Sequence, residues 1–170
     1  EPSEKAIQLA ENKGIKLLKS LNDTPEASTF DVITLWHVLE HLPDLNGHVN
    51  KLKSKLKPNG HLVVAVPNYK CWDAKYYGSL WAGYDVPRHL WHFSRESIHQ
   101  LFKKHGMAVT ETKPMLFDSF YVSLLSEKYK TGKMRFFHGA LIGLLSNMKA
   151  LVSGEYSSII YIIKKDESAF

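Results

Sequence analysis

The sequence predicts an α/β protein with a doubly wound sheet. Segments with helical periodicity alternate along the chain with short apolar segments typical of strands. Two of those segments, "FDVITLW" (30–36) and "HLVVAVP" (61–67), are nearly continuous in apolar and β-branched residues. Such runs are typical of strands that are buried on both faces of a parallel sheet, with helices packed on each side.

The chain begins with a predicted helix and a short strand candidate. Ser3 is a good N-cap for a helix that runs to about Asn12. Gly14 then suits the position after a helix, where a positive φ carries little penalty. "IKLL" (15–18) is a strand candidate, and a polar loop follows it.

The middle of the chain predicts a strand, a helix and another strand. The strand 30–36 is followed by a lysine-rich amphipathic helix at about 45–56. "KPNG" (57–60) ends this helix, and the strand 61–67 comes next. A long aromatic segment, 68–93, then separates this unit from the rest of the chain.

The last part of the chain mixes helices and strands. Ser94 is the predicted N-cap of a helix, and "MAVTETKPM" (107–115) alternates like a strand. Residues 117–152 predict one or two helices, and "SSIIYIIKK" (157–165) predicts a closing strand.

Composition limits the class of protein and its partners. At 170 residues, with 44% hydrophobic and 23% charged residues, the chain has the size and composition of one globular domain. The net charge of +5 favours an anionic partner, but the lysines are scattered, so a nucleic-acid partner is not expected. The single cysteine, Cys71, excludes an internal disulfide and a multi-cysteine zinc site, which indicates a reducing, cytoplasmic location.

The longest apolar stretch is "FFHGALIGLLSNMKALV" (136–152). A membrane span needs roughly 18 or more apolar residues. This stretch is interrupted by His138, Gly139, Gly143, Asn147 and Lys149. We therefore expect no transmembrane segment.

Ionisable residues follow the strand 30–36 directly. His37, Glu40 and His41 come at the carboxyl end of this strand, where ligands bind in open α/β sheets. One interpretation is that these side chains satisfy one another and the backbone through hydrogen bonds. The other is a metal site, because positions i, i+3 and i+4 share one helix face.

Three separate motifs in order resemble one enzyme family. "FDVITLWHVLEHLPDL" (30–45), "LKPNGHLVVAVPN" (56–68) and "PRHLWHFSRESIHQLFKKHGM" (87–107) are similar to segments of class I S-adenosylmethionine (SAM)-dependent methyltransferases, in the ubiquinone-methyltransferase-like branch. The resemblance implies a Rossmann-like sheet, mostly parallel, with an antiparallel last strand. It also implies a single domain over 1–170 that covers about the C-terminal three quarters of the fold, with a helical insertion at about 117–152.

The resemblance implies where SAM binds. In the family an acidic residue accepts hydrogen bonds from both ribose hydroxyls, and Glu1 occupies that place here. Leu21, Leu35, Trp36 and His37 are the other cofactor-binding candidates. The glycine-rich loop of the family would precede Glu1. We therefore expect the sequence as given to be N-terminally incomplete, and to be inactive with weak or no SAM binding.

The resemblance also provides candidates for catalysis and for a metal. His89, His92 and Tyr84 are the catalytic candidates, since a histidine near neutral pKa suits removal of an acceptor proton. His37, Glu40, His41 and His89 are similar to the divalent-cation site of small-RNA 2′-O-methyltransferases. We favour hydrogen bonding as the explanation of these side chains and expect no metal.

The implied function is transfer of a methyl group to an O, N or C centre of a small-molecule acceptor. The alternatives are a non-catalytic, partner-binding remnant of the fold and a metal-assisted nucleic-acid 2′-O-methyltransferase. The predicted helices at 117–152 could be an acceptor lid, the surface of a homodimer, a lipid-contacting helix or plain core.

Overall fold

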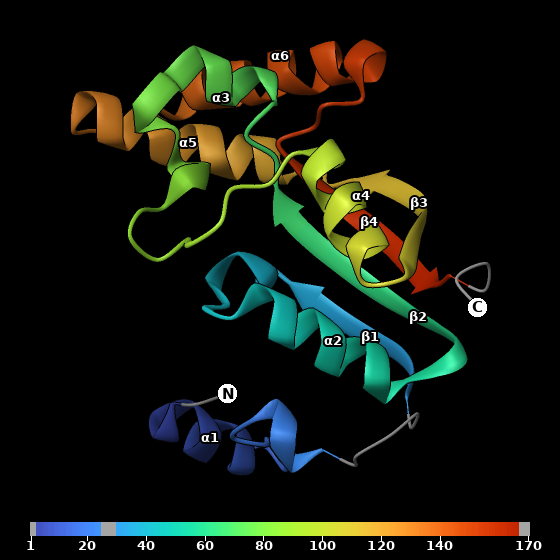
Figure 1. Ribbon diagram of the computed structural model, residues 1–170. Coiled ribbons are helices and arrows are strands. Elements are labelled where there is room, and N and C mark those ends of the chain that lie inside the picture. The colour runs from blue at the N-terminus through green and yellow to red at the C-terminus, as the bar shows by residue number, and fades with distance from the viewer. Residues whose placement is uncertain (1–2, 25–29, 167–170) are drawn as a thin grey trace.

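The fold is built on a four-stranded mixed sheet (Figure 1). The computed structural model of the protein describes residues 3–24 and 30–166. In spatial order the strands are β1 (Phe30–Trp36), β2 (Leu56–Pro67), β4 (Ser158–Lys165) and β3 (Met107–Pro114). Strand β1 pairs parallel with β2, whereas β4 runs antiparallel to both β2 and β3. The predicted α/β sheet with an antiparallel last strand is confirmed.

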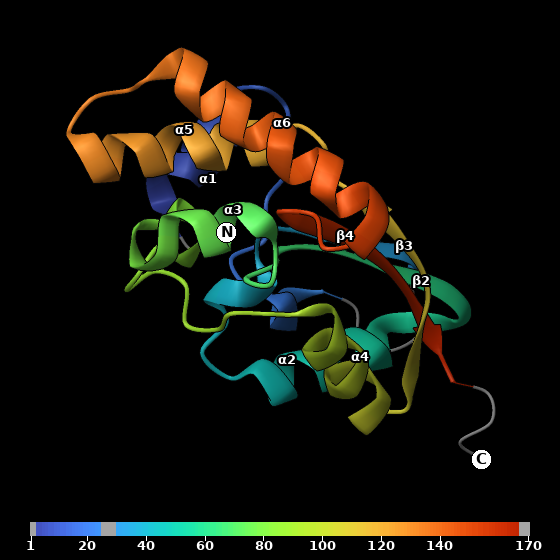
Figure 2. The same ribbon diagram turned by 90° about the horizontal axis from the view of Figure 1, so that it is seen from above.

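Most of the helices lie on a face or at an end of this sheet, while the first helix lies beyond the β1 edge (Figure 1). The helices are α1 (Glu4–Glu11), α2 (Leu45–Lys55), α3 (Trp72–Tyr77), α4 (Arg95–Lys104), α5 (Asp118–Thr131) and α6 (Phe136–Ser153). Helices α2 and α4 cover the same face of the sheet (Figures 1 and 2). Helices α3, α5 and α6 lie together at the end where β1 and β2 finish (Figure 1).

Local capping sets the starts of three helices. The Ser3 hydroxyl accepts a hydrogen bond from the Ala6 amide at the start of α1, and Ser94 does the same for Ser97 in α4. At α2, the Asp44 carboxylate accepts from the Gly47 amide. The predicted helix starts at Ser3 and Ser94 are confirmed.

The main core fills the space between the sheet and helices α2 and α4. Alternate side chains of β2 and β4 point into it, as the two-residue period of a strand requires. The largest fully buried members are Leu39, Leu56, Leu62, Ile98, Phe102, Met107, Tyr161 and Ile163.

Two strand predictions need correction. Residues 15–18 form no strand, although their apolar pattern favours one. Strand β1 exists as predicted but is not buried on both faces, since Val32 is 54% and Trp36 is 51% exposed. Among the described strands β1 pairs only with β2 and so lies at the sheet edge, which leaves alternate side chains accessible.

The segment 57–60 was expected to be a break between helix and strand. Helix α2 does end at Lys55, but β2 begins at Leu56 and includes 57–60. The pairing with β1 shifts register between Phe30 and Val32, so the extra residues are accommodated in a bulge.

The two long helices pack unusually close together. A Cβ added at Gly139 would lie 2.9 Å from the Leu124 Cα, and one at Gly143 would lie 2.8 Å from the Phe120 Cα. Glycines four residues apart therefore let the α6 backbone touch the backbone of α5. This packing explains two of the residues that interrupt the apolar stretch 136–152.

A second core joins these helices to α3. Its buried members are Cys71, Ala74, Tyr77, Trp81, Ala82, Val122 and Ile142. Burial raises the pKa of the Cys71 thiol, which makes it a structural residue rather than a nucleophile.

One buried carboxylate connects the parts of this helical layer. Asp73 is fully buried and accepts hydrogen bonds from Trp81 Nε1 at 2.7 Å, Ser146 Oγ at 2.6 Å and Ser157 Oγ at 2.8 Å. These donors come from three different segments, and the short distances are typical of bonds to a charged acceptor. Asp73 therefore fixes α3 against α6 and the segment that leads into β4.

We predict that Asp73→Ala lowers the free energy of unfolding by on the order of 3 kcal/mol. It leaves three buried donors without their acceptor, and each costs roughly 1 kcal/mol or more. Urea unfolding followed by circular dichroism measures the change. Asp31→Ala is the control, because the exposed Asp31–Lys57 ion pair should contribute less than about 1 kcal/mol. Equal effects of the two substitutions would contradict the assigned role.

Candidate active site

The site begins where β1 ends. His37 follows Trp36 with a φ of 51°, and its amide donates to the Ala65 carbonyl at 3.0 Å. A positive φ is costly for a residue with a side chain, so the surrounding structure must hold it. The 3₁₀ turn η2 (Leu39–His41) follows immediately and places its ionisable side chains at the carboxyl end of the sheet.

A distant segment, 84–93, docks on this turn. The amides of Leu90 and Trp91 both donate to the Glu40 carbonyl, at 2.8 and 3.3 Å. His41 Nδ1 donates to the Arg88 carbonyl at 2.9 Å, and the Trp91 indole donates to the Leu42 carbonyl at 2.8 Å. These contacts bring together the two groups of ionisable residues that the sequence leaves far apart.

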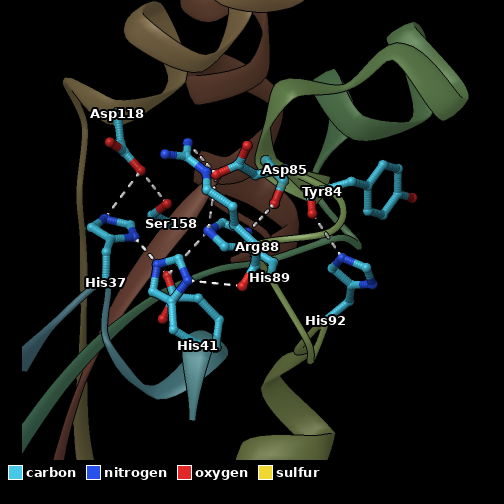
Figure 3. Close-up of polar contacts among 11 residues, drawn as sticks. His37, His41, Tyr84, Asp85, Arg88, His89, His92, Asp118 and Ser158 are labelled. Atoms are coloured by element: carbon cyan, nitrogen blue, oxygen red, sulfur yellow. Dashed lines mark hydrogen bonds and ion pairs between the residues drawn. The ribbon is translucent and has the colours of Figure 1, made fainter. Parts of the chain in front are cut away.

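The Glu40 carboxylate lies between His37 and His89, which Figure 3 shows on neighbouring segments. It is fully buried, and its Oε1 accepts from His37 Nδ1 at 3.2 Å. His89 Nε2 lies 3.9 Å from the same oxygen. The other nitrogen of the His37 ring, Nε2, lies 3.6 Å from an Asp118 oxygen, which is an ion-pair distance. His37 is thus held between two carboxylates.

The two histidines beside Glu40 have pKa values shifted in opposite directions. The hydrogen bond to Glu40 raises the pKa of His37, and the charge of Asp118 adds to this effect against the opposing effect of burial. Burial lowers the pKa of His89, although Glu40 and Asp85 oppose the shift. The arrangement thus favours a protonated His37 and a neutral His89.

His89 has a defined orientation. Its Nδ1 donates to the Gly83 carbonyl at 2.9 Å, so the neutral ring carries its proton there. Its Nε2 then has a free lone pair, and Asp85 Oδ2 lies 3.8 Å from it. Asp85 also forms an ion pair with Arg88.

These side chains line a cavity of about 180 Å³ at the end of the sheet. The polar part of its wall contains His37, Asp85, Arg88, His89 and Asp118. Helix α5 supplies the opposite wall through Tyr121, Val122, Leu125 and Tyr129. His37 and Asp85 are the non-glycine residues with positive φ in the described part of the chain. Strained backbone is typical of functional sites.

A second cavity, of about 680 Å³, is lined by Val38 and Leu42, the residues just before and just after the turn η2. Leu21 and Leu35 both line it, with Val38 and Leu42 completing an apolar wall. Asn22 adds a polar side chain to its lining.

The remaining cofactor candidates lie elsewhere. Glu1 lies outside the described residues. Trp36 is half exposed on the open face of β1, away from both cavities. His37 lines the smaller cavity, next to the histidine pair.

Two of the three catalytic candidates lie outside the smaller cavity. Tyr84 packs edge-on against Trp81 at the second core, and burial raises the pKa of its phenol. His92 Nε2 donates to the Tyr84 carbonyl at 3.0 Å, and its ring lines a separate groove beside α4. Figure 3 shows both residues set apart from His37 and His89.

The structure groups three of the four metal-ligand candidates. Glu40, His41 and His89 each offer a ligand atom, and these atoms lie within 4.8 Å of one another. His41 and His89 also make an edge-to-face contact, with ring centroids 4.7 Å apart. His37 is instead occupied by Glu40 and Asp118.

Asp118 is one of the site residues that the sequence analysis missed, with Asp85 and Arg88. It is the first residue of α5, and it also accepts a hydrogen bond from the Ser158 hydroxyl. An acidic residue in a first helical turn is normally explained by the helix dipole, so the sequence carries no signal of its second role.

Comparisons with known proteins agree with this architecture. A SAM-dependent methyltransferase from Thermotoga maritima has 19% sequence identity and a TM-score of 0.63, over 98% of this chain and 71% of that one. A SAM-dependent methyltransferase from Archaeoglobus fulgidus has 18% identity and a TM-score of 0.56, over 97% and 74%.

A third similar structure contains bound ligands. It is the 1,6-didemethyltoxoflavin-N1-methyltransferase of Burkholderia thailandensis, with S-adenosylhomocysteine and its substrate. Its identity is 13% and its TM-score 0.52, over 98% of this chain and 58% of that one.

No curated protein matches the chain in sequence. A family model described as "Methyltransferase domain" matches residues 1–112. The chain therefore belongs to the methyltransferase-domain family, and its fold is that of class I SAM-dependent methyltransferases.

Proposed function

We propose that the protein methylates an O, N or C centre of a small-molecule acceptor, as a member of the ubiquinone-methyltransferase-like branch. The observation that carries this proposal is the pair of cavities beside the turn after β1. The larger cavity is the proposed SAM site and the smaller one the proposed acceptor site. This placement follows the rule that open α/β sheets bind ligands beyond the carboxyl ends of their strands.

The residues of the larger cavity fit a nucleoside. Leu21, Leu35, Val38 and Leu42 provide an apolar wall suited to a flat base, and Asn22 offers a polar side chain. SAM supplies an electrophilic methyl group when it is bound. Glu1 remains our proposed ligand of the ribose hydroxyls, on the strength of the family resemblance.

His89 is the proposed general base. Its Nδ1 proton is held by the Gly83 carbonyl, and Nε2 is therefore able to accept the proton that an O–H or N–H acceptor loses on methylation. The lowered pKa keeps the ring neutral near pH 7. Asp85 and Glu40, each just under 4 Å from Nε2, stabilise the imidazolium that forms.

His37 is the proposed counter-ion of Glu40. A protonated His37 balances the charge of the buried Glu40 carboxylate, and it also faces Asp118. The site therefore requires no metal to neutralise Glu40. The grouping of Glu40, His41 and His89 supports a second candidate function, metal-assisted 2′-O-methylation.

The extent of the domain, its location in the cell and the class of its acceptor are also proposals. We propose that residues 1–170 form one methyltransferase domain that acts in the cytoplasm, and that nucleic acid is not its acceptor. The scattered lysines and the small volume of the acceptor cavity, about 180 Å³, support this view.

One experiment tests both the proposed methyl transfer and the role of His89 as general base. We expect the full-length protein to transfer label from tritiated SAM to a small-molecule extract, and His89→Ala to lower kcat by about 10²–10⁴-fold. SAM binding by calorimetry should be unchanged, because His89 lies outside the larger cavity. The wild-type profile of kcat against pH should show an acidic limb below the ordinary histidine pKa of about 6.5, and the variant should lose it.

His92→Ala is the matched control, since His92 lies outside the acceptor cavity, and it should retain nearly full activity. Full activity of His89→Ala would exclude His89 as the base. Absence of both SAM binding and label transfer in the wild-type protein would contradict the proposed function itself.

We predict that His37 titrates above the ordinary histidine pKa of about 6.5. A raised folded-state pKa means that this ion pair stabilises the fold fully below about pH 6.5 and loses that effect as pH rises through the folded value. NMR titration of the His37 ring protons measures it. Glu40→Gln should lower the His37 pKa more than Asp118→Asn does, because the Glu40 hydrogen bond is the larger cause. A wild-type value at or below the ordinary one would contradict this charge assignment.

We expect methyl transfer to survive exhaustive chelation. If His37 neutralises Glu40, removal of divalent ions leaves the site intact, and activity should change by less than about twofold, within ordinary assay variation. Activity is measured after chelation and again after addition of magnesium, manganese, zinc or cobalt. Loss of activity that one ion restores in the wild-type protein, but not in His41→Ala, would favour the metal-assisted alternative.

A further inference from the structure

The α5–α6 hairpin (117–153) carries an exposed apolar stripe on its outer side. The stripe consists of Phe137, Leu141, Leu144, Met148 and Leu151. Their spacing of three or four residues places them on one side of α6. Phe137 is 89% exposed and Leu151 is 75% exposed. Figure 2 shows α6 along the outer edge of the molecule, away from α2 and α4.

An apolar groove widens this stripe. It lies between α5 and α6, has a volume of about 360 Å³, and is lined by Phe117, Phe120, Tyr121, Leu124, Phe136 and Ala140. Water-exposed proteins rarely leave contiguous apolar surface of this kind uncovered, because its burial is favourable. The outer side of the hairpin therefore needs a partner.

The charges of the hairpin indicate the chemistry of that partner. The basic residues are Lys128, Lys130, Lys133, Arg135 and Lys149. The acidic residues are Asp118 and Glu127, and both are withdrawn from the outer surface. Glu127 is 1% exposed and paired with His138, while Asp118 belongs to the active site. The exposed charge of the hairpin is thus positive, and four of the five cations lie within 128–135, at the end of α5 and in the turn that follows it. Arg135 also lies 3.9 Å from Glu127, and the Lys130 ammonium lies over the Tyr76 ring, so Lys128 and Lys133 are the two cations chosen for the test.

Helix α6 cannot serve as a free transmembrane span in this fold. By length and composition alone, α6 is the described helix that could cross a membrane. However, Gly139 and Gly143 pack against the α5 backbone, and Ser146 donates to Asp73 on the same inner side. A helix whose inner side is engaged by its own protein and whose outer side is apolar fits the plane of a membrane interface.

A second copy of the chain is a less favourable partner for this surface than an anionic lipid surface is. A symmetric dimer would bring the same surface of both copies together. The hairpin has no exposed acidic side chain to face its basic turn. Just beyond α6, Glu155 is already bonded to Asn68.

We propose that the α5–α6 hairpin docks the protein on the surface of an anionic membrane. The stripe and groove bury their apolar side chains at the boundary between headgroups and acyl chains. The basic turn 128–135 faces lipid phosphates, which fits the negative surface potential of a cytoplasmic leaflet.

The test is vesicle co-sedimentation of the full-length protein. Vesicles of equimolar phosphatidylcholine and phosphatidylglycerol should bind the protein, vesicles of phosphatidylcholine alone should bind it at least about tenfold more weakly, and added salt should release it. Two double variants, Phe137→Ser with Leu151→Ser and Lys128→Gln with Lys133→Gln, should each weaken binding at least about tenfold. All four side chains are exposed, so both variants should fold like the wild type.

Matched controls are available on α1 and beside it. Leu9→Ser removes an exposed apolar side chain, and Lys13→Gln with Lys16→Gln removes two exposed charges, at sites far along the chain. These variants should bind vesicles like the wild type. Failure of the wild-type protein to bind the anionic vesicles would overturn the proposal. So would a dimer in ultracentrifugation that the Phe137→Ser, Leu151→Ser variant dissociates while vesicle binding stays unchanged.

Discussion

The docking of segment 84–93 on the turn after β1 is the contact on which the site depends. Glu40 makes this contact in two ways. Its carbonyl accepts hydrogen bonds from the amides of Leu90 and Trp91, and its buried carboxylate faces His37 and His89. The backbone bonds fix the position of the segment, and the carboxylate sets the charge that the histidines experience. Without this contact His89 would lie on a loop with no defined distance to the end of the sheet.

Asp73 and Glu40 are two of the buried carboxylates in the described part of the chain, and their surroundings differ. Asp73 accepts three hydrogen bonds from donors that do not titrate near neutral pH, and these bonds hold segments of the fold together. Glu40 has an oxygen, Oε2, with no hydrogen-bond partner among the described residues, and its neighbours are histidines that gain or lose protons. Incomplete satisfaction of a buried charge is costly, and such groups are more frequent at functional sites.

Local signals in the sequence predicted most of the elements, whereas the contacts between elements needed the structure. Ser3 and Ser94 cap helices through bonds to residues three positions away, which a sequence displays directly. The apolar run of β1 gave the strand but not its place at the sheet edge, because periodicity does not report pairing. His37 and His89 were both candidates from sequence. Their convergence depends on backbone bonds across some fifty residues, and Asp118 had no sequence signal beyond a helix start.

Helix α5 lines the proposed acceptor cavity and also forms part of the exposed hairpin, and this links the two. Val122, Leu125 and Tyr129 line the cavity, while Phe117 and Leu124 line the outer groove of the same helix, and Tyr121 lines both. At Gly139 and Gly143 the backbones of α5 and α6 are in direct contact, with no side chain between them. Closely packed helices move as a unit, because their packing cannot be deformed gradually. A partner bound on the outer side of the hairpin would therefore act on one wall of the acceptor cavity through a single rigid body. Asp118, at the start of α5, would carry the same displacement to His37.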